Sequence, residues 1–257
     1  MKKLYASIIA LSTLASANAF GAPDEIQVYT DEMNAPGEYG LELHLNYVPQ
    51  GSTAVNHPGE LVSNHRFQAQ AEFSYGINKE FEAGLYVPTA LSSDGNFYLT
   101  GLRPRLKYMH QQAEDEHFFW GLNTEFGYST LKVTDSMWNM ELRPVIGTHL
   151  DEWTFVVNPI VEIPLSKGGM HTASFEPAFM IKRKINEDLE LGVEHYAGLG
   201  PVSNLQGWKN QEHTTYLAAD FKVKGMDVNF GIGHGYQKAE DDWVIKSIVA
   251  FPFNYTA

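Results

Sequence analysis

Charged side chains recur at alternate positions along several segments of the chain, and an extended strand would place each such set on one face. Arg103, Arg105 and Lys107 form a basic row of this kind, and acidic residues with one arginine follow in the next two segments. Around a narrow polar passage these groups would filter solutes by charge and size. The alternative is that the same groups pair with one another and fill the passage. The candidates for this constriction are Arg103, Arg105, Lys107, Glu125, Glu141 and Arg143.

Histidine and serine residues could support metal binding or hydrolysis. Ser174 and Ser247 lack a G-x-S-x-G motif, and His149 has no evident serine partner. Four histidines lie in or beside segments that we expect to be loops, but no H-x-x-H or HExxH spacing supports a metal site there. They are His57, His65, His171 and His213. We therefore expect no catalytic residue, no metal ligand and no cofactor.

The segment from Arg66 to Tyr75 alternates polar side chains at even positions with apolar or aromatic side chains at odd positions. A strand turns such a segment into one apolar and one polar face. About a dozen segments of roughly ten residues repeat the pattern, which is typical of barrels whose apolar face meets lipid. The sequence therefore predicts an all-β fold, a twelve-stranded antiparallel up-and-down transmembrane β-barrel.

The N-terminus has the features of a secretory leader. A basic start at Lys2 and Lys3 is followed by an apolar run and by the A-x-A sequence that ends at Ala19. We expect residues 1–19 to be a signal peptide, residues 20–37 a periplasmic N-terminal segment, and residues 38–257 the outer-membrane β-barrel.

The connections between the predicted strands alternate in length. Links after even-numbered strands are short, whereas long loops follow the first and ninth strands at residues 49–65 and 198–212. Outer-membrane barrels have short periplasmic turns and longer extracellular loops. Tyr, Trp and Phe residues also gather at the two ends of the predicted strands, as expected at membrane–water boundaries. Both patterns predict an even strand number and termini in the periplasm.

Composition narrows the classes of partner. The formal net charge is -13, and it becomes -15 when the leader with its two lysines is removed, so phosphate repulsion argues against nucleic acid as a partner. Cysteine is absent, which excludes disulfides and thiol chemistry.

The closing segment, residues 243–255, alternates and ends on the aromatic Tyr255. It resembles the terminal strand of outer-membrane proteins, which the barrel assembly machinery reads. Residues 101–108, the Asn158-Pro159 pair and the overall size resemble the outer-membrane barrels grouped under the meta-pathway of phenol degradation. This resemblance implies a channel or uptake protein for small compounds, including aromatic ones, and it supplies no functional residues.

Prolines interrupt several of the predicted strands, where each removes a ladder hydrogen bond. Bulges in the wall could absorb them. Alternatively, they weaken the wall enough for a lateral opening through which an apolar solute leaves for the membrane. The candidates for this opening are Pro144, Pro159 and Pro177.

Taken together, the patterns favour an outer-membrane channel for the passive uptake or efflux of small solutes. Its expected partners are outer-membrane lipid, the barrel assembly machinery through the C-terminal strand, and a small-molecule solute. Two other classes fit the same pattern. One is a membrane-embedded lipid-modifying enzyme, a hydrolase or an acyltransferase, and the other is a structural or surface barrel.

Overall fold

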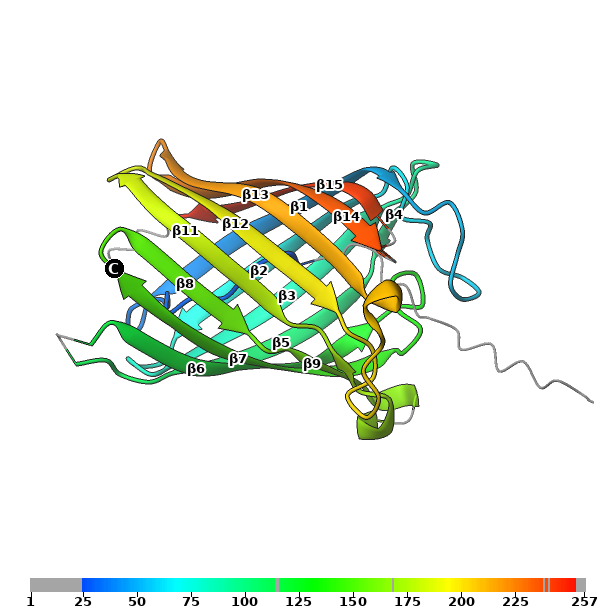
Figure 1. Cartoon of the computed structure of the whole chain (residues 1–257), viewed down its shortest axis with the longest axis horizontal. Coiled ribbons are helices and arrows are strands. Elements are labelled where there is room, and N and C mark those ends of the chain that lie inside the picture. The colour runs from blue at the N-terminus through cyan, green and yellow to red at the C-terminus, as the bar shows by residue number, and fades with distance from the viewer. Residues whose placement is uncertain (1–24, 114–115, 168, 238, 240, 253–257) are drawn as a thin grey trace, which may run out of the picture.

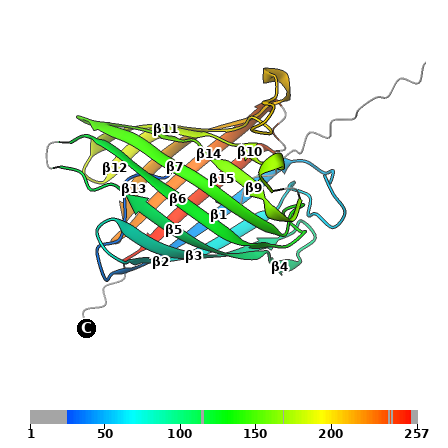
Figure 2. The same ribbon diagram turned by 90° about the horizontal axis from the view of Figure 1, so that it is seen from below.

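The computed structural model describes residues 25–113, 116–167, 169–237, 239 and 241–252. These residues form a closed antiparallel β-barrel in which each strand pairs with its neighbours along the chain (Figures 1 and 2). The barrel closes where β1 (Tyr39–Gly51) pairs with β15 (Asp241–Phe251). The predicted leader, residues 1–19, lies outside the described residues.

Twelve strands make up the wall, as predicted, because three of them are each divided into two pieces. The divided strands are β4 with β5, β8 with β9, and β10 with β11. Three short 3₁₀ turns lie in the connections, and no helix among the described residues is long and apolar enough to cross a membrane. The remaining elements are β2 (Phe67–Gly76), β3 (Phe81–Leu91), β4 (Phe97–Leu99), β5 (Gly101–Met109), β6 (Phe118–Ser129), β7 (Trp138–Leu150), β8 (Trp153–Asn158), β9 (Val161–Pro164), η1 (Leu165–Lys167), η2 (Gly169–Thr172), β10 (Ser174–Phe175), β11 (Ala178–Asn186), β12 (Leu189–Gly198), η3 (Trp208–Asn210), β13 (Glu212–Val223) and β14 (Met226–Gln237).

The two faces of the wall have the predicted polarity. On β2 the polar Gln70 and Glu72 are buried inside, whereas Phe73 and Tyr75 are exposed outside. Period-two alternation produces this arrangement because successive side chains of a strand point to opposite faces. The outer face is thus a broad apolar surface, of the kind that meets lipid in transmembrane barrels.

Aromatic side chains pack together at both ends of the strands. At the end with the short turns, the Phe81 and Tyr108 ring centroids lie 5.1 Å apart and Tyr108 lies 5.8 Å from Trp120. At the loop end, Trp138 contacts Phe126 at 5.5 Å and Tyr128 at 5.6 Å. The two aromatic girdles that the sequence predicts are therefore present.

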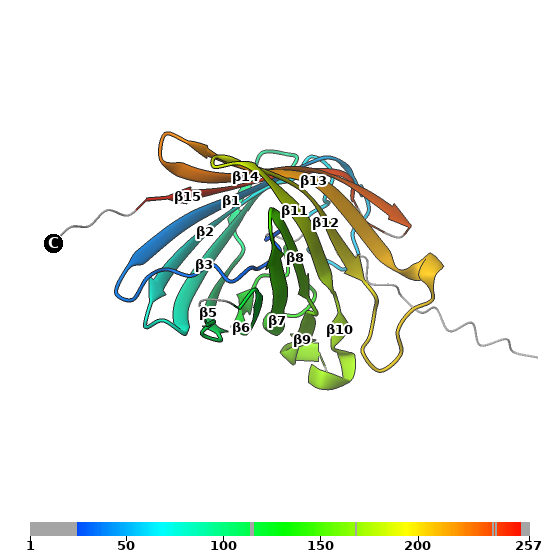
Figure 3. The same ribbon diagram turned by 60° about the vertical axis from the view of Figure 1, so that its left-hand side comes forward.

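Residues 25–36 run inside the barrel, from its loop end to the end with the short turns, where β1 begins (Figure 3). Glu25, Ile26, Val28 and Tyr29 of this N-terminal segment are buried. This corrects the expectation that residues 20–37 form a periplasmic lead-in, at least for the part that the structure describes. The segment fills the lumen that the wall encloses.

Part of the interior is apolar. Phe119, Val145 and Val156 point inward from β6, β7 and β8 and form a cluster with Val28 and Tyr29 of the segment. Gly147 leaves room for this cluster, since a Cβ there would lie 2.2 Å from the Phe119 ring. We expected an interior lined by polar groups throughout. The N-terminal segment explains the difference, because it brings apolar side chains of its own to cover this part of the wall.

Candidate functional site

The N-terminal segment is clamped to the wall by one side chain. The Asn158 Oδ1 atom accepts a hydrogen bond from the Tyr29 backbone N–H at 2.7 Å, and the Asn158 Nδ2 atom donates to the Tyr29 carbonyl at 3.1 Å. Asn158 is fully buried. The Asn158 amide thus satisfies both the N–H and the carbonyl of Tyr29, as a neighbouring strand would. This matters because unpaired peptide groups are costly in a buried position.

Arg143, on the adjacent strand β7, holds the same part of the segment. Its Nε and Nη2 atoms donate to the two oxygens of Glu141 at 2.7 and 3.0 Å, which is a bidentate pair. Its Nη1 atom donates to the Gln27 carbonyl at 3.1 Å and lies 3.4 Å from Glu25 Oε1. The guanidinium also stands 4.3 Å from the centre of the Tyr29 ring.

Arg105 and Lys107 hold the segment nearer the turn end. Arg105 pairs with Glu72, at 2.8 Å from its Nε atom, and with Glu82 at 2.6 Å. Glu82 in turn accepts hydrogen bonds from the backbone and side-chain amides of Asn34, both at 2.7 Å. Lys107 donates to the Glu32 carbonyl at 2.6 Å. Wall charges therefore reach the segment directly and through their own counter-ions.

Arg103 and Glu125 complete the set of predicted constriction residues. Arg103 donates to Gln70 at 2.8 Å, and its Nε atom lies 3.8 Å from Glu125. Glu125 also accepts a hydrogen bond from Asn123 at 3.1 Å. All six predicted residues face the lumen, where they pair with wall residues and with the N-terminal segment. The arrangement is nearer to a filled passage than to an open ring of charges.

His149 has partners that sequence reasoning did not find. Its Nδ1 atom lies 3.0 Å from the Thr154 hydroxyl, and its Nε2 atom lies 3.1 Å from Asp31 of the segment. The imidazole thus holds the segment to β7 near the turn end. The nearest hydroxyl partner is a threonine, and no G-x-S-x-G nucleophile turn surrounds it.

A cavity of about 300 Å³ remains between the segment and the loops. Tyr196 and Tyr216 line one side of it, with ring centroids 5.5 Å apart. Carboxylates outnumber guanidinium groups in its lining. The acidic groups include Glu25, Glu60, Asp135, Glu141 and Glu212, and the basic ones are Arg66, Arg103 and Arg143. The field in this cavity therefore favours cations over anions.

The predicted lateral-opening prolines lie level with one another across three adjacent strands. The ladder between β7 and β8 ends at the pair Ile146 and Val157, and that between β7 and β9 resumes at Leu142 and Val161. The register is the same on both sides of this gap, so Pro144 lies opposite Pro159. In the same way, Pro159 lies opposite Pro177 between the two pieces of the next strand. Asn158, which clamps the segment, borders this gap.

Sequence reasoning missed the segment and its clamp. The only sign of the segment was a short apolar alternation at Ile26 and Val28, which is much shorter than a wall strand. Asn158 stood out only as an amide at the end of an otherwise apolar strand beside Pro159. Neither signal reveals a contact between residues 129 positions apart.

A comparison with protein-family models gives no match, and neither does a comparison with curated proteins. Solved structures are similar in fold. The KdgM porin shares 10% identity, with 84% of this chain and 99% of that chain covered and a TM-score of 0.58. The NanC porin shares 8% identity over 83% of this chain and 100% of that chain, with a TM-score of 0.59.

A third similar structure is the COG4313 outer membrane channel from Pseudomonas putida F1. It shares 11% identity, with 88% of this chain and 99% of that chain covered and a TM-score of 0.58. At such identities the likeness concerns the fold alone. The chain thus has the barrel fold of these outer-membrane porins and channels over nearly their whole length.

Proposed function

We propose that the chain is an outer-membrane channel for small solutes, closed at rest by its own N-terminal segment. The observation that carries this proposal is the way the segment is held. Side chains such as Asn158 hold residues 25–36 in the lumen, while each wall strand pairs only with other wall strands. Side-chain contacts of this kind can break and re-form without opening the wall.

The likeness in fold to two porins and an outer membrane channel supports the same proposal. So does the outer surface, because a continuous apolar face with aromatic residues at both strand ends matches a bilayer. The outer membrane is therefore the proposed location, reached through the predicted signal peptide and with the C-terminal strand as the predicted signal for the assembly machinery.

The proposed solutes are small neutral or cationic compounds with an aromatic or apolar part. The carboxylate surplus around the cavity favours cations, and Tyr196 with Tyr216 offers aromatic surface. One KdgM porin structure is in complex with disordered oligogalacturonate. A polyanion of that kind would meet repulsion from carboxylates such as Glu60 and Asp135, which line the cavity of this chain. The aromatic preference accords with the resemblance to the meta-pathway barrels.

We further propose that apolar solutes leave sideways through the gap at Pro144, Pro159 and Pro177. The apolar cluster of Val145, Val156 and Ile160 backs this gap from inside the lumen. A displaced segment would uncover that cluster, and an apolar solute would then lie beside a part of the wall where the ladder is interrupted.

Planar-bilayer recordings and liposome swelling of the purified barrel test the function. The solute series should contain neutral sugars, organic acids, amines and phenolics of matched size. We expect flux that rises when the clamp is weakened by Asn158→Ala and that is greater for amines and phenolics than for acids. If no solute passes and phospholipid or lipopolysaccharide is turned over, the chain is a lipid-modifying enzyme. If neither happens, it is a structural or surface barrel.

A further inference from the structure

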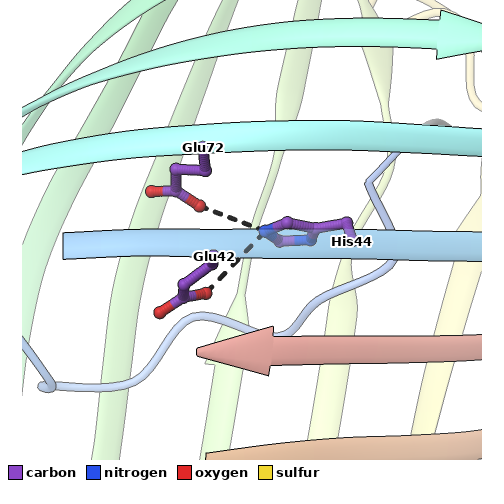
Figure 4. Close-up of side chains that lie close together, drawn as sticks. All are labelled: Glu42, His44 and Glu72. Carbon is purple, nitrogen blue, oxygen red and sulfur yellow. Dashed lines mark hydrogen bonds and ion pairs between the residues drawn. The ribbon is translucent and has the colours of Figure 1, made fainter. Parts of the chain in front are cut away.

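Two carboxylates converge on one imidazole nitrogen in the wall near the turn end of the barrel (Figure 4). The His44 Nε2 atom lies 3.1 Å from Glu72 Oε2 and 3.8 Å from Glu42 Oε2. The imidazole N–H can donate a hydrogen bond to only one of these oxygens. Hydrogen bonding to the ring therefore does not account for the second carboxylate. We infer that Glu42, His44 and Glu72 form a binding site for a divalent transition-metal ion such as Zn²⁺.

The backbone fixes these three side chains on one face. Glu42 and His44 are two positions apart on β1, so both point into the lumen. Glu72 is the registered partner of Glu42 on β2. Like charges directly opposite each other destabilise a sheet, and a bound cation between them would reverse that effect.

The distances suit a small cation. The three ligand atoms all lie within 4.8 Å of one another. Ligand atoms around a tetrahedral zinc ion are separated by about 3.4 Å, because each bond is about 2.0–2.2 Å long. The two distances to His44, 3.1 and 3.8 Å, lie on either side of that value, so a small movement of the Glu42 carboxylate toward the imidazole is what an ion requires. Rotation of the Glu42 side chain supplies this movement.

Neighbouring residues orient the Glu72 carboxylate for metal binding and leave the Glu42 carboxylate available to bind an ion. Arg105 engages the Oε1 atom of Glu72, which leaves Oε2 directed at the ring. Such an outer contact orients a metal-binding carboxylate. Among the described residues, the Glu42 carboxylate has no hydrogen-bond or ion-pair partner except His44. Its side chain is 34% exposed, so an ion can reach the site from that side.

The donor set determines which ions fit. One imidazole nitrogen and two carboxylate oxygens suit zinc and neighbouring first-row ions, whereas magnesium and calcium prefer oxygen ligands only. Three protein ligands around zinc leave a fourth position for water. Arg105 is shared between Glu72 and Glu82 and forms no ion pair with Glu42 in the described part of the chain, so the pocket has negative charge for the ion to neutralise.

Isothermal titration with Zn²⁺ of the full barrel, purified in detergent without a polyhistidine tag and treated with EDTA, tests the site. We expect one ion per chain, and binding at least about tenfold weaker in Glu42→Gln and in His44→Gln. Co²⁺ should give a visible absorption band that the same variants lose. Glu42→Gln is the variant that should disturb folding least, because this side chain is partly exposed. Cooperative melting checks the fold of each variant.

The matched control is His213→Gln. His213 and His195 form a close histidine pair away from the proposed site, with the His213 Nδ1 and His195 Nε2 atoms 3.1 Å apart. This variant should bind Zn²⁺ as the unmodified barrel does. If His213→Gln abolishes binding while Glu42→Gln and His44→Gln retain it, or if the unmodified barrel binds no zinc, the proposed site does not exist.

Discussion

Pro144 of β7 lies opposite Pro159, which separates β8 from β9, and neither residue has a backbone N–H to donate to the other strand. The interruption is therefore shared by both sides of one seam. The ladder between β13 and β14 is continuous by comparison, since pairing runs without a gap from Glu212 to Val223. If the wall opens sideways, opening at this seam breaks fewer hydrogen bonds than opening at an uninterrupted seam would.

Locking the seam should block the lateral route. The chain has no cysteine, so the pair Leu142→Cys and Val161→Cys, placed on registered partners beside the gap, gives a single disulfide. We expect formation of the disulfide to lower the flux of phenolics and its reduction to restore that flux. The flux of small sugars along the lumen should be unchanged in both states. Liposome assays with and without reductant measure both.

A disulfide across an uninterrupted seam is the control for that experiment. Leu217→Cys and Ile232→Cys are registered partners on β13 and β14, and their oxidation should alter neither flux. Equal loss of phenolic flux in both cysteine pairs would show that the proline seam has no special role.

Weakening the clamp should open the lumen. Asn158→Ala removes both hydrogen bonds to the Tyr29 backbone and leaves two buried peptide groups unpaired, at a cost of about 1–3 kcal/mol. The population of displaced segment would rise by roughly tenfold, since each 1.4 kcal/mol changes an equilibrium tenfold. Single-channel recordings should show more frequent and longer openings.

Asn229→Ala provides the comparison for the clamp variant. Asn229 also faces the lumen and donates to Asp220 at 2.8 Å, but no hydrogen bond or ion pair joins either residue to the described part of the N-terminal segment. Its removal should leave the opening frequency unchanged. An equal rise in both variants would mean that general loosening of the barrel, rather than release of the segment, opens the channel.

The cavity carboxylates should set ion preference. We expect reversal potentials in a salt gradient to indicate cation selectivity, and we expect Glu60→Gln combined with Asp135→Asn to reduce it, because both side chains line the cavity. Glu187→Gln, in the exposed turn between β11 and β12, should have no effect. Anion selectivity of the unmodified barrel would contradict the proposed solute class.

Breaking the buried ion-pair network should destabilise the barrel far more than breaking an exposed pair. Arg105→Ala leaves Glu72 and Glu82 buried without their guanidinium partner, which should lower the free energy of unfolding by about 3–5 kcal/mol. Arg183→Ala removes an exposed contact of 3.3 Å with Glu152 and should cost about 0–1 kcal/mol. Urea unfolding of both variants in the same lipid or detergent measures the difference.

The wall could be predicted from the sequence because the alternation of polar and apolar residues within each strand defines its two faces. Glu72 and Phe73 are adjacent in the chain and lie on opposite sides of β2, as period-two alternation requires. For the same reason the inward direction of Arg103, Arg105 and Arg143 was predictable. The twelve-stranded barrel is thus confirmed, whereas the signal peptide and the assembly signal remain predictions.

What fills the lumen could not be predicted in the same way. Arg143 meets Glu25 across 118 positions of sequence, and no local pattern connects those two residues. The segment at residues 25–36 lacks the length and alternation of a wall strand, so its sequence does not distinguish an external arm from an internal plug. Its position depends on contacts with several strands at once, which only the closed ring brings together.

The course of the N-terminal segment constrains the order in which the barrel is assembled. The segment leads directly into β1, and β1 pairs with β15, the last strand among the described residues. The ring therefore cannot close until all the strands between these two are in place. Residues 25–36 must either be enfolded before that final pairing or be threaded lengthwise through the completed ring afterwards.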